Sequence, residues 1–295
     1  MAGRTTRRRI IRIQLEPDTA GERADLLAAE EPLGIRIDGQ AVSLTMRTPG
    51  DDIDLTAGFL VSEGIVTSAA DIAGIRICDG SQCDHDHSGD ELGNIADVTL
   101  RAGLTARPGL RRNFLTSSAC GVCGKSSIAD LRVPVSYQLR SDQVTISTEV
   151  LAGLPDALRR AQRVFDRTGG LHAAGLFTAT GSLLAVREDV GRHNAVDKLV
   201  GWALQGGRLP LAGCVLLVSG RASFELVQKA VLAGIPVMAA VSAPSSLAAE
   251  LAEDAGLTLV GFLRGRSMNV YTAPERITRP DQVVRAGSAA RCPPS

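Results

Sequence analysis

Strand-like and helix-like segments alternate through the second half of the chain, and this alternation constrains the fold more than any other feature. Short apolar runs bounded by turn-forming residues have the length of strands, whereas the segments between them repeat apolar residues at helical spacing. The expected strands are 174–179, 182–186, 214–218, 236–241 and 257–263, and the expected helices are 192–204, 224–233 and 246–255. Strands that alternate with helices predict an α/β domain, in which a sheet is covered by helices through right-handed crossovers.

The first part of the chain has a different pattern. Strands are expected at 33–37 and 41–46, joined by a hairpin turn at Asp38 and Gly39, and a helix is expected from near Ile53. Without the regular alternation of the second half, these elements predict a small α+β domain.

A chain of 295 residues is long enough for two domains. Residues 1–8 are basic and precede an expected strand at 9–15, so we interpret them as a flexible tail. A helix with apolar residues from Leu151 to Phe165 is expected to end at Gly169. The expected division is a small α+β domain with its basic tail at 1–112, a mobile C-x-x-C loop at 113–127, an α/β domain at 128–275 and a flexible tail at 276–295.

Charge and hydropathy exclude several classes of protein. Lysine and arginine together number 32, as do aspartate and glutamate, so the chain lacks the positive excess of a nucleic-acid-binding protein. The longest apolar run, 230–241, is interrupted by Gly234 and Pro236 and is shorter than the roughly 18 residues of a membrane-spanning helix. Six cysteines at irregular spacing do not make a disulfide framework. We therefore expect a cytoplasmic protein with no membrane segment and no nucleic-acid partner.

Cys120 and Cys123 form a C-x-x-C motif in the segment NFLTSSACGVCGKSS, residues 113–127. Two thiols at this spacing can bridge, share a metal ion or pass a sulfur atom between them. The small residues around them predict an exposed loop, and Lys125 would stabilise a thiolate. The motif alone leaves open a sulfur carrier, a thiol-disulfide oxidoreductase and a zinc-stabilised nucleotide-binding chaperone, although it lacks the N-terminal βαβ context of thioredoxin-like oxidoreductases.

A second group of potential metal ligands contains Cys78, Cys83, His85 and His87. Their spacing is not that of a standard zinc site, and alternating Asp and His in a Gly/Ser-rich stretch is also typical of a solvated loop. We favour the solvated loop and predict no bound metal.

Polar residues gather where the expected strands lead into helices. In an open α/β sheet, ligands bind beyond the carboxyl ends of the strands, where helix N-termini present unpaired amides. The residues expected there are Arg192, His193, Gly220, Arg221, the segment 242–246, Arg264 and Arg266. Because arginine binds phosphate bidentately, this edge predicts a phosphorylated or nucleotide-containing ligand. Other interpretations remain open: His193 as a structural hydrogen-bond partner, and Asp197 and Lys198 as a solvated helix face.

Together these segments resemble the FdhD-type formate dehydrogenase accessory sulfurtransferases. The similar segments, in chain order between residues 30 and 272, are EEPLGIRIDG, MRTPGDDIDLTAGFLVSEGI, SSACGVCGK, REDVGRHNAVDKLVG, SGRASFELVQKAVLAGIPV, SAPSSLA and GFLRGRSMNVY. The resemblance implies a cytidine-deaminase-like three-layer α/β/α domain and a homodimer. It also implies a cytoplasmic sulfur carrier that accepts sulfur from a cysteine desulfurase. The sulfur would pass to the molybdenum cofactor, bis(molybdopterin guanine dinucleotide), before this cofactor is inserted into formate dehydrogenase.

The resemblance also implies roles for individual residues. By motif position, Cys120 matches the cysteine that carries a persulfide, and Cys123 matches its partner. The segment that contacts the cofactor matches Phe262, Leu263, Arg264, Gly265, Arg266 and Ser267. We expect the cofactor, or a guanine nucleotide in its place, to be bound also by Arg192, His193, Gly220 and Arg221. The zinc-binding pattern of deaminases, H-x-E with P-C-x-x-C, is absent, so the fold does not imply deamination.

Overall fold

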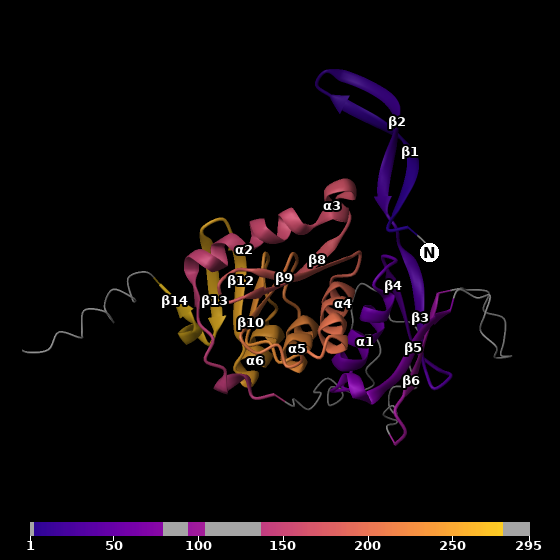
Figure 1. Cartoon of the computed structure of the whole chain (residues 1–295). Helices are drawn as coiled ribbons and strands as arrows, with labels where there is room; N and C mark the ends of the chain where they lie inside the picture. Colours follow the sequence, from indigo (N-terminus) through magenta and orange to yellow (C-terminus); the bar gives the residue numbers. More distant parts are fainter. Residues whose placement is uncertain (1–2, 79–93, 104–136, 280–295) are drawn as a thin grey trace, which may run out of the picture. The chain divides into compact units, whose positions relative to one another are not determined.

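The computed structural model describes residues 3–78, 94–103 and 137–279. Within these residues the chain forms two compact units. The first unit comprises residues 3–78, 94–103, 162–173 and 187–208, and the second comprises residues 137–161, 174–186 and 209–279. Each unit therefore combines segments that are distant in the sequence, as the colours of Figure 1 show. The expected loop at 113–127 lies outside the described residues.

The first unit contains a four-stranded sheet with the order β4-β3-β6-β5. Its strands are β3 (Glu31–Ile37), β4 (Gln40–Arg47), β5 (Ile72–Cys78) and β6 (Ile95–Leu100). β3 pairs antiparallel with β4 and parallel with β6. The expected turn between β3 and β4 is confirmed, and both Asp38 and Gly39 adopt positive φ there. A short 3-10 helix, η1 (Ala69–Asp71), leads into β5.

Two helices of the first unit, α1 (Asp52–Ser62) and α4 (Arg192–Gln205), pack against each other at close range. Their approach depends on Gly58 and Gly201, because a Cβ at either position would overlap a backbone carbonyl oxygen of the opposite helix. α4 confirms the expected helix at 192–204, and it is buried over most of its surface. The sequence places this helix among those of the α/β domain, whereas its contact with α1 makes it part of the first unit.

The second unit contains a six-stranded mixed sheet with the order β13-β12-β11-β10-β8-β9. Its strands are β8 (His172–Thr178), β9 (Leu183–Asp189), β10 (Cys214–Val218), β11 (Val237–Ala240), β12 (Thr258–Arg264) and β13 (Ser267–Thr272). The first two residues of β8 and the last three of β9 belong to the first unit. β10, β11 and β12 are parallel, while β8 runs antiparallel to β10 and β13 runs antiparallel to β12. The central strands β10 and β11 are almost wholly buried, as expected for strands covered on both faces.

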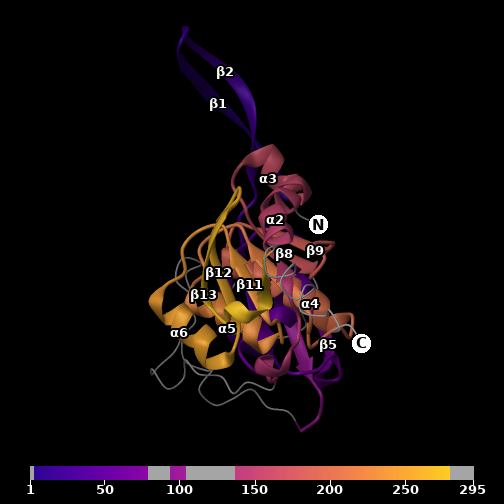
Figure 2. The same cartoon turned by 90° about the vertical axis from the view of Figure 1, so that its left-hand side faces the viewer.

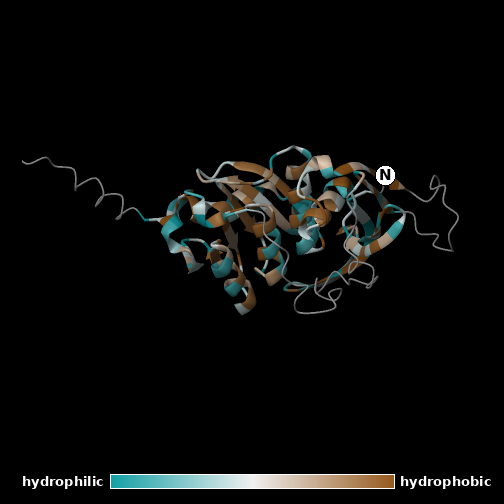
Figure 3. Cartoon of the chain, turned by 90° about the horizontal axis from the view of Figure 1, so that it is seen from below, coloured by the Kyte–Doolittle hydropathy of each residue, from teal (hydrophilic) through white to brown (hydrophobic). Residues whose placement is uncertain are grey.

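Helices cover both faces of this sheet. α5 (Phe224–Leu232) and α6 (Ser246–Ala255) pack side by side, while α2 (Thr148–Ala161) contacts β10 and β12 from the other side (Figures 1 and 2). Hydrophobic and hydrophilic residues alternate along the helical ribbons in Figure 3, as expected for helices with one buried side. The expected three-layer α/β/α architecture accompanied by an α+β part is therefore confirmed, although the α+β unit is not the smaller of the two, because it also takes in 162–173 and 187–208. The likeness to cytidine deaminases stays an expectation. No helix in the described ranges has the length and hydropathy needed to cross a membrane.

The helix expected to run from Leu151 to Gly169 is divided in two. α2 ends at Ala161, and after Gln162 the short α3 (Arg163–Thr168) begins. Gly169 ends α3 in the left-handed conformation, as the sequence predicts. The break marks the point at which the chain passes from the second unit to the first.

The N-terminal residues form more structure than the sequence indicates. β1 (Thr5–Leu15) and β2 (Asp18–Ala28) pair along their whole length as an antiparallel hairpin, so Thr5 to Arg8 are not a flexible tail. The apolar alternation of the sequence is too weak to show β2, which contains Gly21 and four charged residues.

Order also extends past the expected boundary at residue 275. η5 (Pro274–Arg276) and β14 (Ile277–Thr278) follow β13, and β14 pairs with β7 (Ile146–Ser147). Arg276 is buried and donates hydrogen bonds to the carbonyl oxygens of Leu139, in η4 (Leu139–Ser141), and of Gly256. The sequence does not show the contact with Leu139, since it joins residues 137 positions apart.

Candidate functional site

The thiols of the C-x-x-C motif, Cys120 and Cys123, lie outside the described residues. Of the second group of cysteines and histidines only Cys78 is described, and it is buried at the end of β5. Across residues 3–78, 94–103 and 137–279, no three His, Cys, Asp or Glu side chains are arranged to hold a metal ion. The candidate site can therefore be described only from the other predicted residues, which lie at the ends of the strands.

Cys214, at the start of β10, is a free cysteine that we do not expect to share the reactivity of the C-x-x-C thiols. Burial raises the pKa of its thiol, and the nearby carboxylate of Asp142 raises this pKa further. Because the thiolate is the nucleophilic form, Cys214 is a poor nucleophile near neutral pH.

In the second unit, three loops meet beyond the carboxyl ends of β10, β11 and β12. We call residues 219–223, 242–245 and 262–267 the strand-end loops, the third being the hairpin turn that includes the last residues of β12 and the first of β13. The Ser242 amide donates to the Gly220 carbonyl oxygen at 3.2 Å, and the Ala222 amide donates to the Ala243 carbonyl oxygen at 3.2 Å. These backbone hydrogen bonds join the first two loops side by side, in front of the N-termini of α5 and α6.

The third loop is held against the second by its own hydrogen bonds. The Phe262 amide donates to the Ser242 carbonyl oxygen at 3.1 Å, and Arg264 Nε donates to the Val241 carbonyl oxygen at 2.9 Å. Phe262 adopts φ +51°, an uncommon left-handed conformation for a residue with a side chain, and its ring is exposed. Gly265, at φ +53°, makes the turn into β13.

The strand-end loops present positive charge to solvent. The side chains of Arg221, Arg264 and Arg266 are exposed, and none forms an ion pair with a carboxylate among the described residues. By contrast, Leu263 is fully buried, so its side chain is part of the core rather than of a binding surface. Exposed guanidinium groups next to two helix N-termini are suited to bind a phosphate-bearing ligand.

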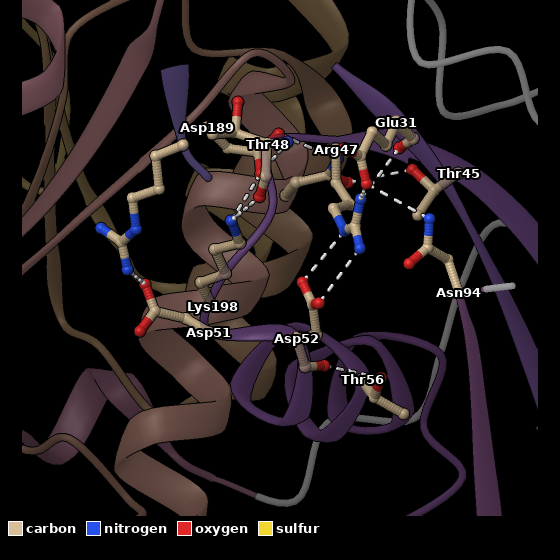
Figure 4. Close-up of polar contacts among 12 residues, drawn as sticks. Glu31, Thr45, Arg47, Thr48, Asp51, Asp52, Thr56, Asn94, Asp189 and Lys198 are labelled. Atoms are coloured by element: carbon tan, nitrogen blue, oxygen red, sulfur yellow. Dashed lines mark hydrogen bonds and ion pairs between the residues drawn. The ribbon is translucent and has the colours of Figure 1, made fainter. Parts of the chain in front are cut away.

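In the first unit, the start of α4 is organised around one buried carboxylate. Asp189 is 0% exposed and forms an ion pair of 2.7 Å with Lys198, which is 1% exposed. Asp189 also accepts hydrogen bonds from the amides of Thr48 and Gly191 and from the side chain of Asn194. Lys198 Nζ donates to the Thr48 carbonyl oxygen at 2.8 Å (Figure 4). We call these five residues the α4 cluster.

The α4 cluster corrects one interpretation of the sequence. Asp197 and Lys198 are almost completely buried, so they do not form a solvated helix face. Ser62 of α1 donates to Asp197 of α4 at 2.6 Å, which is a polar contact between the two helices. Buried charges are stable when they are paired and hydrogen-bonded, and both conditions are met here for Asp189 and Lys198.

Arg192 and His193 lie at the first turn of α4, directly beyond the carboxylate that fixes this end of the helix. His193 is buried, whereas Arg192 is partly exposed. The Nε atom of Arg192 is buried and has no hydrogen-bond partner among the described residues. Arg192 and His193 thus lie at a helix N-terminus in the first unit. The other predicted ligand-binding residues that the structure describes, Gly220, Arg221 and 262–267, lie in the second unit.

His172 belongs to the same region of the first unit but was not indicated by the sequence. Its pKa is lowered from 6.5, first by burial and then by the positive charge of Arg192 and by His193, while Asp189 opposes the shift. The histidine stands alone in the sequence before an apolar strand, so no motif points to it.

Arg47 was also missed by the sequence reading. Its side chain is 2% exposed and forms paired hydrogen bonds of 3.0 and 3.1 Å with Asp52, at the start of α1. It also forms an ion pair of 3.2 Å with Glu31 (Figure 4). These contacts hold the turn between β4 and α1, which contains Thr48 of the α4 cluster, in place.

Comparison with known proteins gives a consistent result over nearly the whole chain. The model of the FdhD/NarQ family matches residues 28–278. A protein of Nocardia farcinica named "Sulfur carrier protein FdhD" is 55% identical over 277 residues, covering 94% of this chain and 96% of the relative. Relatives with the same name from Streptomyces avermitilis and Mycobacterium tuberculosis are 56% and 52% identical. They cover 93% and 94% of this chain, and the matches span 96% and 100% of the relatives.

A solved structure shows the same fold. The crystal structure of a protein described as a formate dehydrogenase accessory protein from Desulfotalea psychrophila matches with a TM-score of 0.69. The match covers 94% of this chain and 100% of that chain, at 24% sequence identity. The likeness therefore extends over both units rather than over one module.

Proposed function

Because the chain belongs to the FdhD/NarQ family, whose members include the sulfur carrier proteins described above, we propose that it carries sulfur for the maturation of formate dehydrogenase. The observation that supports this proposal best is 52–56% identity to named sulfur carriers over more than nine-tenths of the chain. The C-x-x-C motif supplies the thiols that such a role requires.

The proposed reaction begins with a cysteine desulfurase as donor. The thiolate of Cys120 attacks the terminal sulfur of the donor's persulfide, the donor's cysteine thiolate leaves, and Cys120 becomes a persulfide. The client accepts this sulfur when the thiolate of Cys123 attacks Cys120 Sγ, which forms a Cys120–Cys123 disulfide and releases the terminal sulfur as sulfide. A cellular thiol reductant then restores both thiols before the next cycle.

The proposed client is bis(molybdopterin guanine dinucleotide), on its way to formate dehydrogenase. This cofactor carries pyrophosphates, and the strand-end loops combine exposed arginines with backbone amides at the N-termini of α5 and α6. We propose that Arg221, Arg264 and Arg266 bind its phosphates, and that a free guanine nucleotide occupies the same loops. Gly220 brings the backbone close to the ligand, since glycine has no side chain to keep it away.

The same proposal includes a setting and an assembly. We propose that the protein works in the cytoplasm, where its thiols stay reduced between cycles, and that two copies form a homodimer. In this setting the desulfurase, the carrier and the unassembled dehydrogenase meet before the enzyme is complete.

A complementation experiment tests the proposed role. In a strain that lacks its own copy of this protein, formate dehydrogenase activity should return with the wild-type chain and stay at background with Cys120→Ala. Cys214→Ala is the matched control, because it removes a thiol of low reactivity, and it should restore activity fully. Full activity with C120A would contradict the proposal, as would efficient turnover of ordinary disulfide substrates by the purified protein.

A further inference from the structure

Tyr271 is an exposed aromatic residue beside the strand-end loops. It lies on β13, which forms one edge of the six-stranded sheet next to β12 (Figure 2). The residue is 41% exposed, although its ring is largely apolar. Phosphate binding by the arginines of the strand-end loops does not account for an exposed ring at this position.

The ring of Tyr271 lies against the backbone of Gly261, in β12. A Cβ at Gly261 would lie 3.0 Å from Cε2 of Tyr271 and 2.8 Å from Cδ of Pro244. It would also lie 3.3 Å from the Ser242 carbonyl oxygen. Because glycine has no side chain, the ring can approach the backbone at this point, next to the loop 242–245. This close packing restricts the ring in advance and so lowers the entropy cost of binding a ligand to it.

The same contacts connect the ring to the strand-end loops. The Ser242 carbonyl oxygen accepts from the Phe262 amide, and the Ser242 amide donates to the Gly220 carbonyl oxygen. The ring of Phe262 is also exposed, and the guanidinium carbon of Arg264 lies 6.0 Å from its centroid. A ligand that contacts Tyr271 would therefore lie beside the loops that carry the exposed arginines.

Asn269 adds a polar group next to the ring. Residues two apart in a strand point to the same side, and Asn269 Nδ2 donates a long hydrogen bond of 3.5 Å to the Tyr271 hydroxyl oxygen. Asn269 pairs with Gly261 across the two strands, so no side chain lies opposite it. Its exposed carboxamide offers both a donor and an acceptor. A flat apolar ring beside such a group matches a nucleobase, which has flat faces and an edge of donors and acceptors.

We propose that the guanine base of a nucleotide ligand stacks on Tyr271, and that Asn269 forms hydrogen bonds with an edge of this base. Aromatic side chains bind bases by stacking, whereas phosphates bind to positive charge. The ring and the arginines thus contact different parts of one ligand. The inference rests on the nucleotide binding that we propose for the strand-end loops, and it adds the residues that bind the base.

Isothermal titration calorimetry with two ligands, guanosine diphosphate and inorganic pyrophosphate, separates the base from the phosphates. The wild-type chain should bind guanosine diphosphate at least about fivefold more tightly than pyrophosphate. Tyr271→Ala should weaken guanosine diphosphate binding roughly 5- to 150-fold, because the stacking contact is lost. The same variant should bind pyrophosphate within about threefold of wild type, since the arginines are unchanged.

Two further variants test whether the ring is responsible. Tyr271→Phe keeps the ring and should bind guanosine diphosphate within about threefold of wild type. Val270→Ala removes an exposed apolar side chain from the neighbouring position, which points to the opposite side of β13, and should bind both ligands as wild type does. Thermal unfolding and pyrophosphate binding verify that the strand-end loops of each variant are folded.

Equal affinities of Y271A and wild type for guanosine diphosphate would overturn the inference and would assign the ring to packing over Gly261. Equal affinities of wild type for guanosine diphosphate and pyrophosphate would overturn it as well. Either result would leave phosphate binding by the arginines in place. A wild-type chain that binds neither ligand would overturn the proposed nucleotide binding together with this inference, whereas the sulfur-carrier role is tested separately by complementation.

Discussion

The α4 cluster and the strand-end loops both lie at the carboxyl ends of strands, but charged side chains are buried in the first and exposed in the second. In the α4 cluster, Asp189 and Lys198 are buried and bonded to each other and to the backbone. In the strand-end loops, the guanidinium groups of Arg221, Arg264 and Arg266 are exposed. Charge that is already neutralised within the fold supports structure, whereas charge held at the surface by backbone hydrogen bonds is available to a ligand. The difference separates the residues that should control stability from those that should control binding.

Removal of Lys198 should give the largest effect. Lys198→Met would leave the Asp189 carboxylate buried without its counter-charge and should lower the free energy of unfolding by about 3–5 kcal/mol. Arg266→Met, which removes one positive charge from the strand-end loops, should change it by less than about 0.5 kcal/mol. Chemical denaturation measures both. If K198M/D189N is no more stable than K198M, the uncompensated charge is not the cause.

Removal of arginines from the strand-end loops should weaken binding without unfolding. Arg221→Ala/Arg266→Ala should reduce affinity for guanosine diphosphate roughly 10- to 100-fold per arginine that contacts phosphate, at an unchanged melting temperature. Arg160→Ala, an exposed arginine on α2, is the matched control and should bind as wild type does. Isothermal titration calorimetry measures these affinities. Equal affinities of wild type, R221A/R266A and R160A for guanosine diphosphate would show that the arginines of the strand-end loops do not bind phosphate.

A side chain between α1 and α4 should disturb the α4 cluster indirectly. Gly201→Ala would place a methyl group against a backbone carbonyl oxygen of α1, and we expect a loss of about 1–3 kcal/mol. Gly153→Ala, at an exposed position of α2 with open space around it, should instead gain about 0.5–1 kcal/mol from helix propensity. A loss of stability in G201A together with a gain in G153A, both measured by thermal denaturation, would confirm that α1 and α4 pack against each other through glycine.

The smallest effect should be the pH dependence that arises from His172. Its pKa is lower in the folded state than its ordinary 6.5, so the unfolded chain binds the proton more readily. Stability should therefore fall as the pH drops through 6.5 toward the lower folded value, and it should be independent of this group above 6.5. His172→Gln should flatten that part of the stability profile, as followed by denaturation at several pH values. A wild-type profile that rises toward acid would contradict this assignment.

The sequence predicts the elements of the second unit well and the composition of the units poorly. Strands and helices such as 246–255 follow from local periodicity, which is a property of neighbouring residues. The assignment of α4 to the first unit depends on Gly58 and Gly201, two glycines that no local pattern marks as a helix contact. β2 was missed for the same reason, since its pairing with β1 rather than its own alternation defines it.

In the candidate site, too, local sequence patterns predict some features, whereas others depend on tertiary contacts. Exposed residues at strand ends, such as Arg264 and Arg266, could be predicted because turn residues and charge are visible in the sequence. The burial of Lys198 could not, since a lysine in a helix is usually solvated and only tertiary contacts with Asp189 and Thr48 show otherwise. Sequence patterns thus reveal the residues available to a ligand better than those that support them.

The measurement that tests the central claim most directly is the intact mass of the purified protein after incubation with a cysteine desulfurase and cysteine. The account predicts that wild type and Cys123→Ala each gain the mass of one sulfur atom, that a reducing agent removes it, and that Cys120→Ala gains none. A sulfur atom retained by C120A, or no gain on the wild-type chain, would contradict the claim that this protein carries sulfur on Cys120.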